Sequence, residues 1–147
     1  MLFMAVKSTI FYTFTVTLYI RFFMSFPNLQ NKTVLVVEDD DMSFLYLNQL
    51  FMLTGCKVLH ARSGSEALEI FGTRQPDMIL MDIQLPDMEG TVVTERIRRS
   101  GSEIPIIAQT AGKSGDEQDK ALKAGCSDIL IKPFTMEKLF EVISKFA

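Results

Sequence analysis

Short runs of hydrophobic residues alternate with longer amphipathic stretches through most of this chain. Four runs are apolar almost without a break, at residues 34–37, 78–81, 104–108 and 129–131, and a more mixed run lies at residues 57–60. Unbroken runs of this length are typical of strands that are covered on both faces, as in a parallel sheet. The pattern therefore predicts an α/β fold in which a doubly wound, five-stranded parallel sheet carries helices on both faces, with residues 57–60 near an edge.

The stretches between the runs carry signals for helix ends. Ser114 and Glu117 have the spacing of a capping box at a helix N-terminus, and Gly125 is expected to close the same helix in a left-handed conformation. Gly55 and Gly72 are expected to end the first two helices. The regular order of strand and helix signals predicts one globular unit.

The N-terminal part of the chain has a different composition. Residues 1–26 are rich in Phe, Leu, Ile, Val and Thr, and Lys7 and Arg21 are their only charges. The uncharged stretch between these two cations is shorter than the roughly 20 residues that a bilayer span needs. Residues 8–26 could still form a span if Arg21 reached the interface, with the rest of the chain on the cytoplasmic side.

A second interpretation of this segment is that translation starts at Met24, with residues 25–32 as a short polar leader. Composition alone leaves the anchor and the later start open. We expect residues 1–31 to be a hydrophobic N-terminal extension, either an anchor or a wrongly assigned start, and residues 32–147 to form one domain of ordinary size.

The charge of the chain argues against nucleic-acid binding. The formal net charge is −3 at pH 7. Because the charged residues among residues 1–31 are all cations, the net charge of the remainder is more negative than −3. The basic run at residues 96–99 is expected to be a solvated helix end. Cys56 and Cys126 lack the spacing of zinc ligands or a disulfide framework, and the lone His60 is assigned no role.

Polar residues follow four of the predicted strands, and the carboxyl ends of parallel strands share the edge of the sheet where ligands bind. Acids at residues 38–41 follow the first strand, and Asp82, Thr110 and Lys132 follow the third, fourth and fifth strands. Converging carboxylates repel one another unless a hard divalent cation such as Mg²⁺ lies among them. Because Mg²⁺ commonly also binds phosphate oxygens, the set predicts a phosphoryl site at which Lys132 opposes the negative charge and Thr110 donates a hydrogen bond.

Each of these residues also has a simpler explanation when it is taken alone. One acid among residues 39–41 is expected to cap the first helix, Asp82 could begin a turn, and Thr110 and Lys132 could be ordinary surface groups. These explanations do not account for four complementary residue types on one edge of the sheet. We therefore interpret the residues as one site.

In the order and spacing of these residues, the chain resembles the receiver domain of two-component response regulators, of the single-domain CheY-like type. The likeness runs from about residue 32 to residue 146. It is carried by Val-Val-Glu-Asp-Asp at 36–40, Met-Asp-Ile-Gln-Leu-Pro-Asp-Met-Glu-Gly at 81–90, Thr-Ala at 110–111 and Lys-Pro-Phe at 132–134. It implies a flavodoxin-like fold with receiver topology.

The resemblance also implies roles for single residues. Asp82 would be the phosphorylated aspartate and would share Mg²⁺ with Asp39, with Glu38 through water and with the main-chain carbonyl of Gln84. Thr110 and Lys132 would contact the phosphoryl group. The phosphoryl donor would be a phosphohistidine on a sensor histidine kinase or on a histidine phosphotransfer protein.

One position departs from the family pattern. The family usually has an aromatic residue three positions before the lysine, where this chain has Ile129. Receiver switching commonly couples that aromatic residue to the threonine. We therefore expect the coupling from Thr110 to be weaker or to be carried differently.

Two other functions remain as alternatives to a cytoplasmic phosphorelay regulator that signals through protein contacts. A Mg²⁺-dependent phosphohydrolase with an aspartyl-phosphate intermediate would need a second acid two residues after the nucleophile, where this chain has Gln84. A flavodoxin-like cofactor binder would need a Gly-rich phosphate loop after the first strand, where this chain has four acids. The absence of any magnesium-dependent change would favour a phosphorylation-independent interaction module. The sequence favours a protein that assists its own phosphorylation and dephosphorylation and is otherwise no enzyme.

Overall fold

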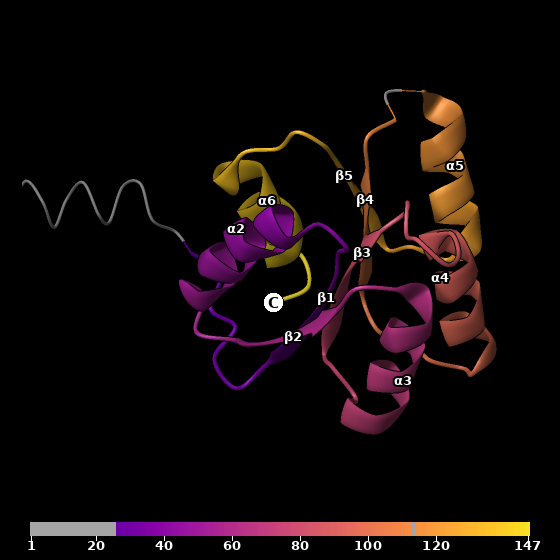
Figure 1. The fold of residues 1–147 in the computed structure, drawn as a ribbon. Coiled ribbons are helices and arrows are strands. Elements are labelled where there is room, and N and C mark those ends of the chain that lie inside the picture. The colour runs from indigo at the N-terminus through magenta and orange to yellow at the C-terminus, as the bar shows by residue number, and fades with distance from the viewer. Residues whose placement is uncertain (1–25, 113) are drawn as a thin grey trace, which may run out of the picture.

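The computed structural model describes residues 26–112 and 114–147 and contains one parallel sheet with the strand order β2-β1-β3-β4-β5 (Figure 1). The strands are β1 (Thr33–Val37), β2 (Lys57–Ala61), β3 (Met78–Asp82), β4 (Ile106–Thr110) and β5 (Asp128–Ile131). The helices are α2 (Asp41–Met52), α3 (Gly64–Arg74), α4 (Gly90–Arg99), α5 (Gly115–Ala124) and α6 (Met136–Ser144). The predicted five-stranded, doubly wound sheet is confirmed, including the edge position of β2.

Helices cover both faces of the sheet, with α2 and α6 on one side and α3, α4 and α5 on the other (Figure 1). Successive residues of β1 point to opposite faces, so Val34 and Val36 belong to one core cluster and Leu35 and Val37 to the other. All four are fully buried. Two filled layers explain why the central strands read as unbroken hydrophobic runs.

The fourth strand begins two residues later than its hydrophobic run predicts. Pro105 has no N–H to donate to the sheet, so the strand pairs from Ile106 onward. It extends through Gln109 to Thr110, which pairs with Ile131. Thr110 is therefore the last residue of a strand, as Asp82 is in β3, and the sheet fixes the backbone of both.

Two of the predicted helix ends are wrong. Gly72 lies inside α3, which continues to Arg74 and is closed by Gln75 at φ 47°. No atom lies near the position of a Gly72 side chain, and one exposed glycine costs a helix only about 1 kcal/mol. The predicted capping box is also absent, because Ser114 makes no side-chain cap bond and Glu117 bonds to another part of the chain.

The predicted acidic N-cap of the first helix and the predicted left-handed cap at Gly125 are confirmed, and Gly55 lies shortly after its predicted helix end. Asp40 caps α2 by accepting a hydrogen bond of 2.7 Å from the Ser43 N–H. Gly125 closes α5 at φ 106°. Gly55 follows α2 only after a further turn and adopts φ 78°.

The basic run at the end of α4 is only partly solvated, contrary to our expectation. Arg98 is half-buried, and its guanidinium donates to three main-chain carbonyls at 2.8–3.0 Å, those of Gly125, Ser102 and Ile104. The side chain therefore ties α4 to the loops at the amino edge of the sheet. Arg96 and Arg99 are exposed, as expected.

Of the hydrophobic extension predicted at residues 1–31, residues 1–25 lie outside the described part of the structure. Leu29 is buried, and the ring of Phe26 packs edge-on against that of Phe140 with centroids 5.2 Å apart. Within residues 26–112 and 114–147, no helix combines the length and the hydropathy that a bilayer crossing requires.

Candidate functional site

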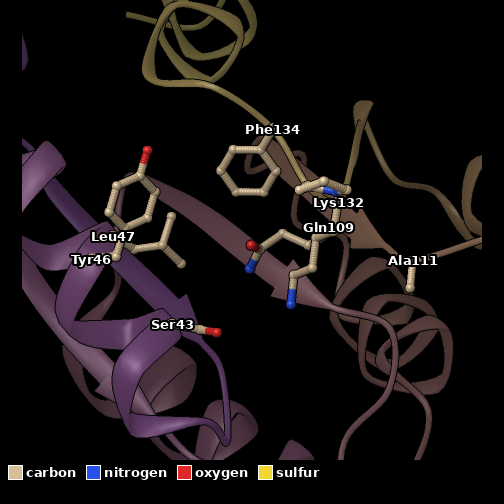
Figure 2. Close-up of a pocket in the computed structure, with 8 residues that line it drawn as sticks. Ser43, Tyr46, Leu47, Gln109, Ala111, Lys132 and Phe134 are labelled. Atoms are coloured by element: carbon tan, nitrogen blue, oxygen red, sulfur yellow. The ribbon is translucent and has the colours of Figure 1, made fainter.

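The carboxyl edge of the sheet borders a cavity of about 420 Å³ between α2 and the segment that leads from β5 into α6 (Figure 2). Its lining residues are Ser43, Tyr46, Leu47, Gln109, Ala111, Lys132, Pro133 and Phe134. The side chain of Gln109 is fully buried here, and its amide finds no hydrogen-bond partner among the described residues.

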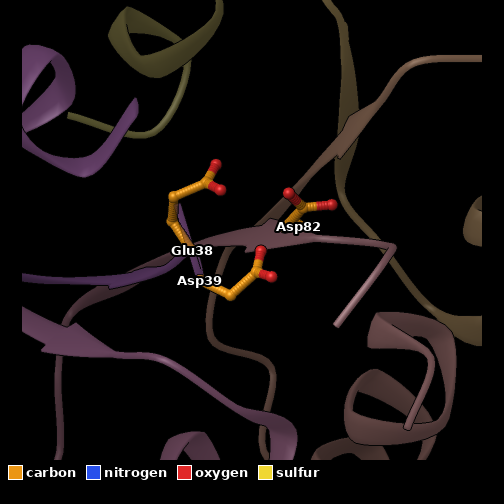
Figure 3. Close-up of side chains that lie close together, drawn as sticks. All are labelled: Glu38, Asp39 and Asp82. Carbon is orange, nitrogen blue, oxygen red and sulfur yellow. The ribbon is translucent and has the colours of Figure 1, made fainter. Parts of the chain in front are cut away.

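Three predicted metal ligands converge next to this cavity. Glu38 and Asp39 directly follow β1, and Asp82 ends the neighbouring strand β3 (Figure 3). One carboxylate oxygen of each lies within 4.8 Å of the others. Glu38 and Asp82 are buried, whereas Asp39 is exposed. Hard oxygen donors at this spacing fit the predicted Mg²⁺, so the donor set and the predicted ion agree.

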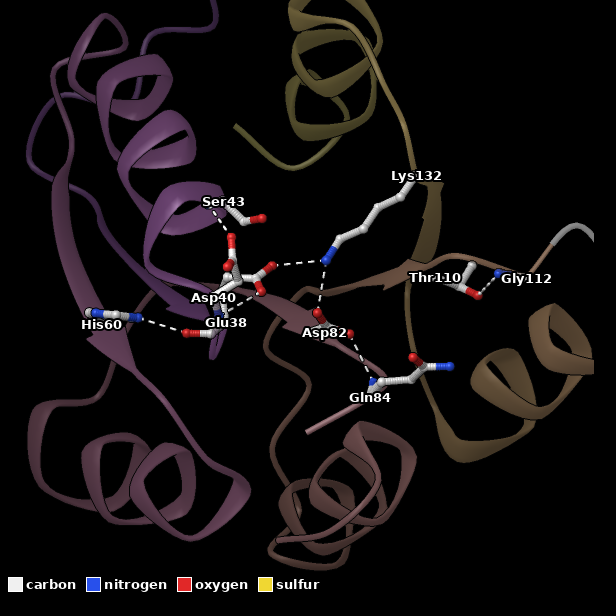
Figure 4. A network of polar contacts seen from close by, with 9 residues as sticks. All are labelled: Glu38, Asp40, Ser43, His60, Asp82, Gln84, Thr110, Gly112 and Lys132. Atoms are coloured by element: carbon white, nitrogen blue, oxygen red, sulfur yellow. Dashed lines mark hydrogen bonds and ion pairs between the residues drawn. The ribbon is translucent and has the colours of Figure 1, made fainter. Parts of the chain in front are cut away.

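Lys132 joins two of these acids. Its Nζ donates to Glu38 Oε2 at 2.9 Å and to Asp82 Oδ2 at 2.8 Å (Figure 4). Burial disfavours the charged ammonium, but the hydrogen bonds and charges of Asp82 and Glu38 outweigh this effect and raise the pKa of Lys132 above 10.5. Lys132 is therefore a fixed cation that directly contacts the candidate phosphoacceptor.

The second oxygen of Asp82 is held by the loop that follows it. Asp82 Oδ1 accepts a hydrogen bond of 2.8 Å from the Gln84 N–H. Gln84 also forms an isolated antiparallel bridge with Glu89, which brings the two ends of the loop together. The predicted ligand role of the Gln84 carbonyl remains a prediction.

Asp87 anchors the same loop to α3, a role that the sequence analysis did not assign. Its carboxylate accepts hydrogen bonds from the Gly64 N–H at 2.7 Å, the Ser65 N–H at 2.9 Å and the Ser65 hydroxyl at 2.7 Å. The bonds from the Ser65 hydroxyl and N–H, followed by that from Gly64, lower the pKa of Asp87 to about 2. Asp87 thus supplies an anion at the N-terminus of a neighbouring helix.

Thr110 is at the predicted edge of the sheet, but its hydroxyl forms hydrogen bonds with residues other than Asp82. The hydroxyl donates to Glu117 Oε2 at 2.5 Å and accepts from the Gly112 N–H at 2.9 Å. Glu117 is a site residue that sequence reasoning missed, because its spacing from Ser114 suggested a helix cap. The predicted contact of Thr110 with a phosphoryl group remains a prediction.

His60 supports the backbone beneath the acids. Its Nε2 lies 2.8 Å from the main-chain oxygen of Glu38, and its ring stacks on Phe44 with centroids 3.5 Å apart. Since the Glu38 oxygen can only accept, Nε2 carries a hydrogen in this contact. His60 thus joins β2 to the residue that begins the acidic cluster.

Comparisons with known proteins cover the same part of the chain. The profile of the family described as response regulator receiver domain matches residues 34–144. The polar-differentiation response regulator DivK of Brucella ovis is 32% identical over 117 residues, which are 78% of this chain and 95% of that protein.

Solved structures give the same result. The receiver domain of a sensor histidine kinase from Pseudomonas aeruginosa, with a magnesium ion coordinated in its active-site cleft, is 30% identical with a TM-score of 0.73, and the match covers 78% of this chain and 96% of that chain. The receiver domain of a Francisella response regulator is 28% identical with a TM-score of 0.74, over 79% of this chain and 96% of that chain.

Proposed function

This chain belongs to the response regulator receiver domain family of two-component signalling, and we propose that Asp82 is the residue on which it accepts a phosphoryl group. The observation that carries the proposal is the environment of the Asp82 carboxylate. One oxygen is held by the Gln84 N–H, the other by the Lys132 ammonium, and two more acids lie within metal-sharing distance. No other aspartate in the described residues combines these contacts.

Receiver domains bind Mg²⁺ at their acidic site, and the ion supplies charge neutralisation to phosphoryl oxygens when it is bound. For this chain we assign the ligands to the carboxylates of Asp39 and Asp82, to Glu38 through water and to the main-chain carbonyl of Gln84. The convergence of the three carboxylates supports this assignment. Asp39 is the exposed member of the three.

Three residues of the chain would have separate roles in the transfer. A carboxylate oxygen of Asp82 attacks phosphorus, the bond from phosphorus to the donor nitrogen breaks, and the imidazole leaves with the electron pair. Lys132 already points at Asp82 and opposes the charge on the phosphoryl oxygens as they approach. Thr110 is the second donor, and its movement toward the phosphoryl group would change the surface that follows β4.

Receiver domains take their phosphoryl groups from histidine kinases, and we propose a sensor histidine kinase or a histidine phosphotransfer protein as the donor here. The protein would act in the cytoplasm through protein contacts, with residues 32–147 as the receiver domain and residues 1–31 as a hydrophobic extension. It would assist only its own phosphorylation and dephosphorylation, since the residue two positions after Asp82 is Gln84, which can act as neither acid nor base.

Intact-protein mass spectrometry tests the proposal directly. The full chain is incubated with acetyl phosphate and Mg²⁺, beside an Asp82→Asn variant and a sample with chelator. We expect one phosphoryl adduct on the unaltered chain and none in the other two samples. An adduct that persists in Asp82→Asn would move the acceptor to another residue.

A hydrolysis assay with a generic phosphate ester separates this function from the phosphohydrolase alternative. We expect turnover at background level, because no acid follows Asp82 at the required spacing. Turnover well above background that is lost in Asp82→Asn would establish the enzyme instead.

A further inference from the structure

The Thr110 hydroxyl has one hydrogen to donate, and in this structure it donates it to Glu117. The distance from Thr110 Oγ1 to Glu117 Oε2 is 2.5 Å, and Thr110 Oγ1 also accepts the Gly112 N–H at 2.9 Å. A hydroxyl is a single donor. While this contact persists, Thr110 therefore cannot donate to a group on Asp82.

The local structure is arranged to allow the contact. Glu117 lies in the first turn of α5 and is partly buried, and it does not cap its own helix. A Cβ atom on Gly112 would collide with the Glu117 carboxylate. The absence of a side chain at Gly112 thus leaves the space that the carboxylate occupies when it meets Thr110.

We infer that Glu117 is a positioning residue that holds the Thr110 hydroxyl away from Asp82 in the unphosphorylated protein and has to release it when Asp82 is phosphorylated. The inference rests on the proposed function of Asp82. Two acceptors would compete for the hydrogen of the Thr110 hydroxyl. The Glu117 carboxylate accepts it before transfer, and a phosphoryl oxygen accepts it afterwards. Both acceptors are anionic, so neither outcome leaves the hydroxyl without a charged partner.

Release of Glu117 would also carry the change to α5. The Thr110–Glu117 bond joins the end of β4 to the first turn of that helix. When the bond breaks, the carboxylate of Glu117 is free to turn toward solvent, and the N-terminus of α5 loses a contact with the sheet. This gives a physical route from the phosphoryl group to the surface of α5. The chain would use this route although Ile129, in the strand beside Thr110, replaces the aromatic residue that is usual in the family.

The test measures the initial rate of adduct formation with acetyl phosphate and Mg²⁺ in Glu117 variants of the full chain. We expect Glu117→Ala to raise the rate by about two- to tenfold, the factor for one hydrogen bond of ordinary net strength. Glu117→Gln keeps a weaker, neutral acceptor and should fall between Ala and the unaltered chain. A rate in both variants equal to that of the unaltered chain overturns the inference.

Two controls separate the hydrogen bond from a general effect of charge. Asp116→Ala removes one negative charge from the same turn at an exposed position, and it should leave the rate unchanged. In a Thr110→Val background, which has no hydroxyl, Glu117→Ala should also have no effect. An equal rise in Asp116→Ala, or a rise that persists without the hydroxyl, would mean electrostatic repulsion and overturn the inference.

The outcomes also distinguish this inference from the proposed function. If the unaltered chain forms no adduct, the phosphoacceptor role of Asp82 fails and the role of Glu117 fails with it. If the adduct forms but the Glu117 variants react at the normal rate, only the role of Glu117 fails. A nuclear magnetic resonance shift of the Gly112 amide in Glu117→Ala, absent in Asp116→Ala, would support the contact in the unphosphorylated state.

Discussion

The loop after β3 and the loop after β4 leave the sheet from neighbouring strands, yet they are held in different ways. The first, residues 83–89, is fixed at both ends and in the middle. Gly90 donates to the Ile83 carbonyl at 2.8 Å, Gln84 bridges to Glu89, and Asp87 accepts three hydrogen bonds from the start of α3. The Gln84 N–H at its beginning is bonded to Asp82.

The second loop begins at Ala111 and leads to Ser114, the N-cap of α5. In its described residues, the contacts with the site converge on one side-chain oxygen, the Thr110 hydroxyl, which Gly112 and Glu117 share. The Ser114 side chain makes no cap bond.

The contrast separates two tasks within one edge of the sheet. The loop after β3 holds the candidate acceptor in a fixed geometry, which lowers the cost of reorganisation during transfer. In the described residues of the loop after β4, the Thr110 hydroxyl donates an exchangeable hydrogen bond to Glu117, so a new acceptor at Asp82 can compete for it. The predictions below test whether the first region is rigid and the second adjustable.

The largest effect is expected from Lys132→Met, which removes the cation bonded to Asp82, the residue that the loop after β3 holds in place. The side chain keeps much of its length but loses the bonds to Glu38 and Asp82. Loss of one preorganised donor typically lowers a rate by about 10²–10³-fold, so the rate with acetyl phosphate should fall by roughly that factor. The rate is followed by intact-protein mass spectrometry.

Lys138→Met is the matched control, because Lys138 is an exposed lysine on α6 that pairs with Glu141. It should react at the rate of the unaltered chain. If Lys132→Met also reacted at that rate, the cation would be irrelevant to transfer.

The second effect is on stability and compares Gly90, at the end of the loop after β3, with Gly72, an open position within α3. A Cβ on Gly90 would collide with the main-chain oxygen of Asp82, which the sheet holds in place. Gly90→Ala should therefore lower the free energy of unfolding by about 1–3 kcal/mol, as other overpacked sites do. Gly72→Ala, at an open position within α3, should raise it by up to about 1 kcal/mol. Urea unfolding measures both.

Gly112→Ala should behave differently, because the atom that its Cβ would meet is the end of the Glu117 side chain. A side chain can turn away, so the free energy of unfolding should change by less than in Gly90→Ala. The displaced carboxylate would release Thr110, and the phosphorylation rate should rise as in Glu117→Ala. Equal destabilisation by the two glycine variants would contradict the difference between the loops.

Much of the candidate site could be predicted from sequence, for a physical reason. Hydrophobic period and strand order bring the carboxyl ends of parallel strands to one edge, so Glu38, Asp39, Asp82 and Lys132 could be placed together without coordinates. The starting residue of β4 was less predictable, since the hydrophobic run includes Ile104 and Pro105 but the sheet pairing begins after them.

The contacts of Asp87 and Glu117 could not be predicted in the same way. Asp87 bonds to residues more than 20 positions earlier, and no local spacing marks that pairing. Glu117 stands three residues after Ser114, so a local rule assigned it to a helix cap, but in the structure the Thr110 hydroxyl binds it instead. The local capping rule failed for Glu117, because its carboxylate can accept a hydrogen bond either from its own helix N-terminus or from Thr110.

The smallest effect is expected at Asp87, and it appears in the dependence of stability on pH. The pKa of Asp87 is lowered from 3.8 to about 2 in the folded protein, so folding favours its charged form. The stabilisation is fully present above pH 4 and is lost as the pH falls toward 2. Asp87→Asn should therefore lower the urea midpoint at pH 6, and its difference from the unaltered chain should shrink as the pH approaches 2. If the difference in urea midpoint stayed constant over this range, the contacts of Asp87 with α3 would stabilise the protein independently of its charge.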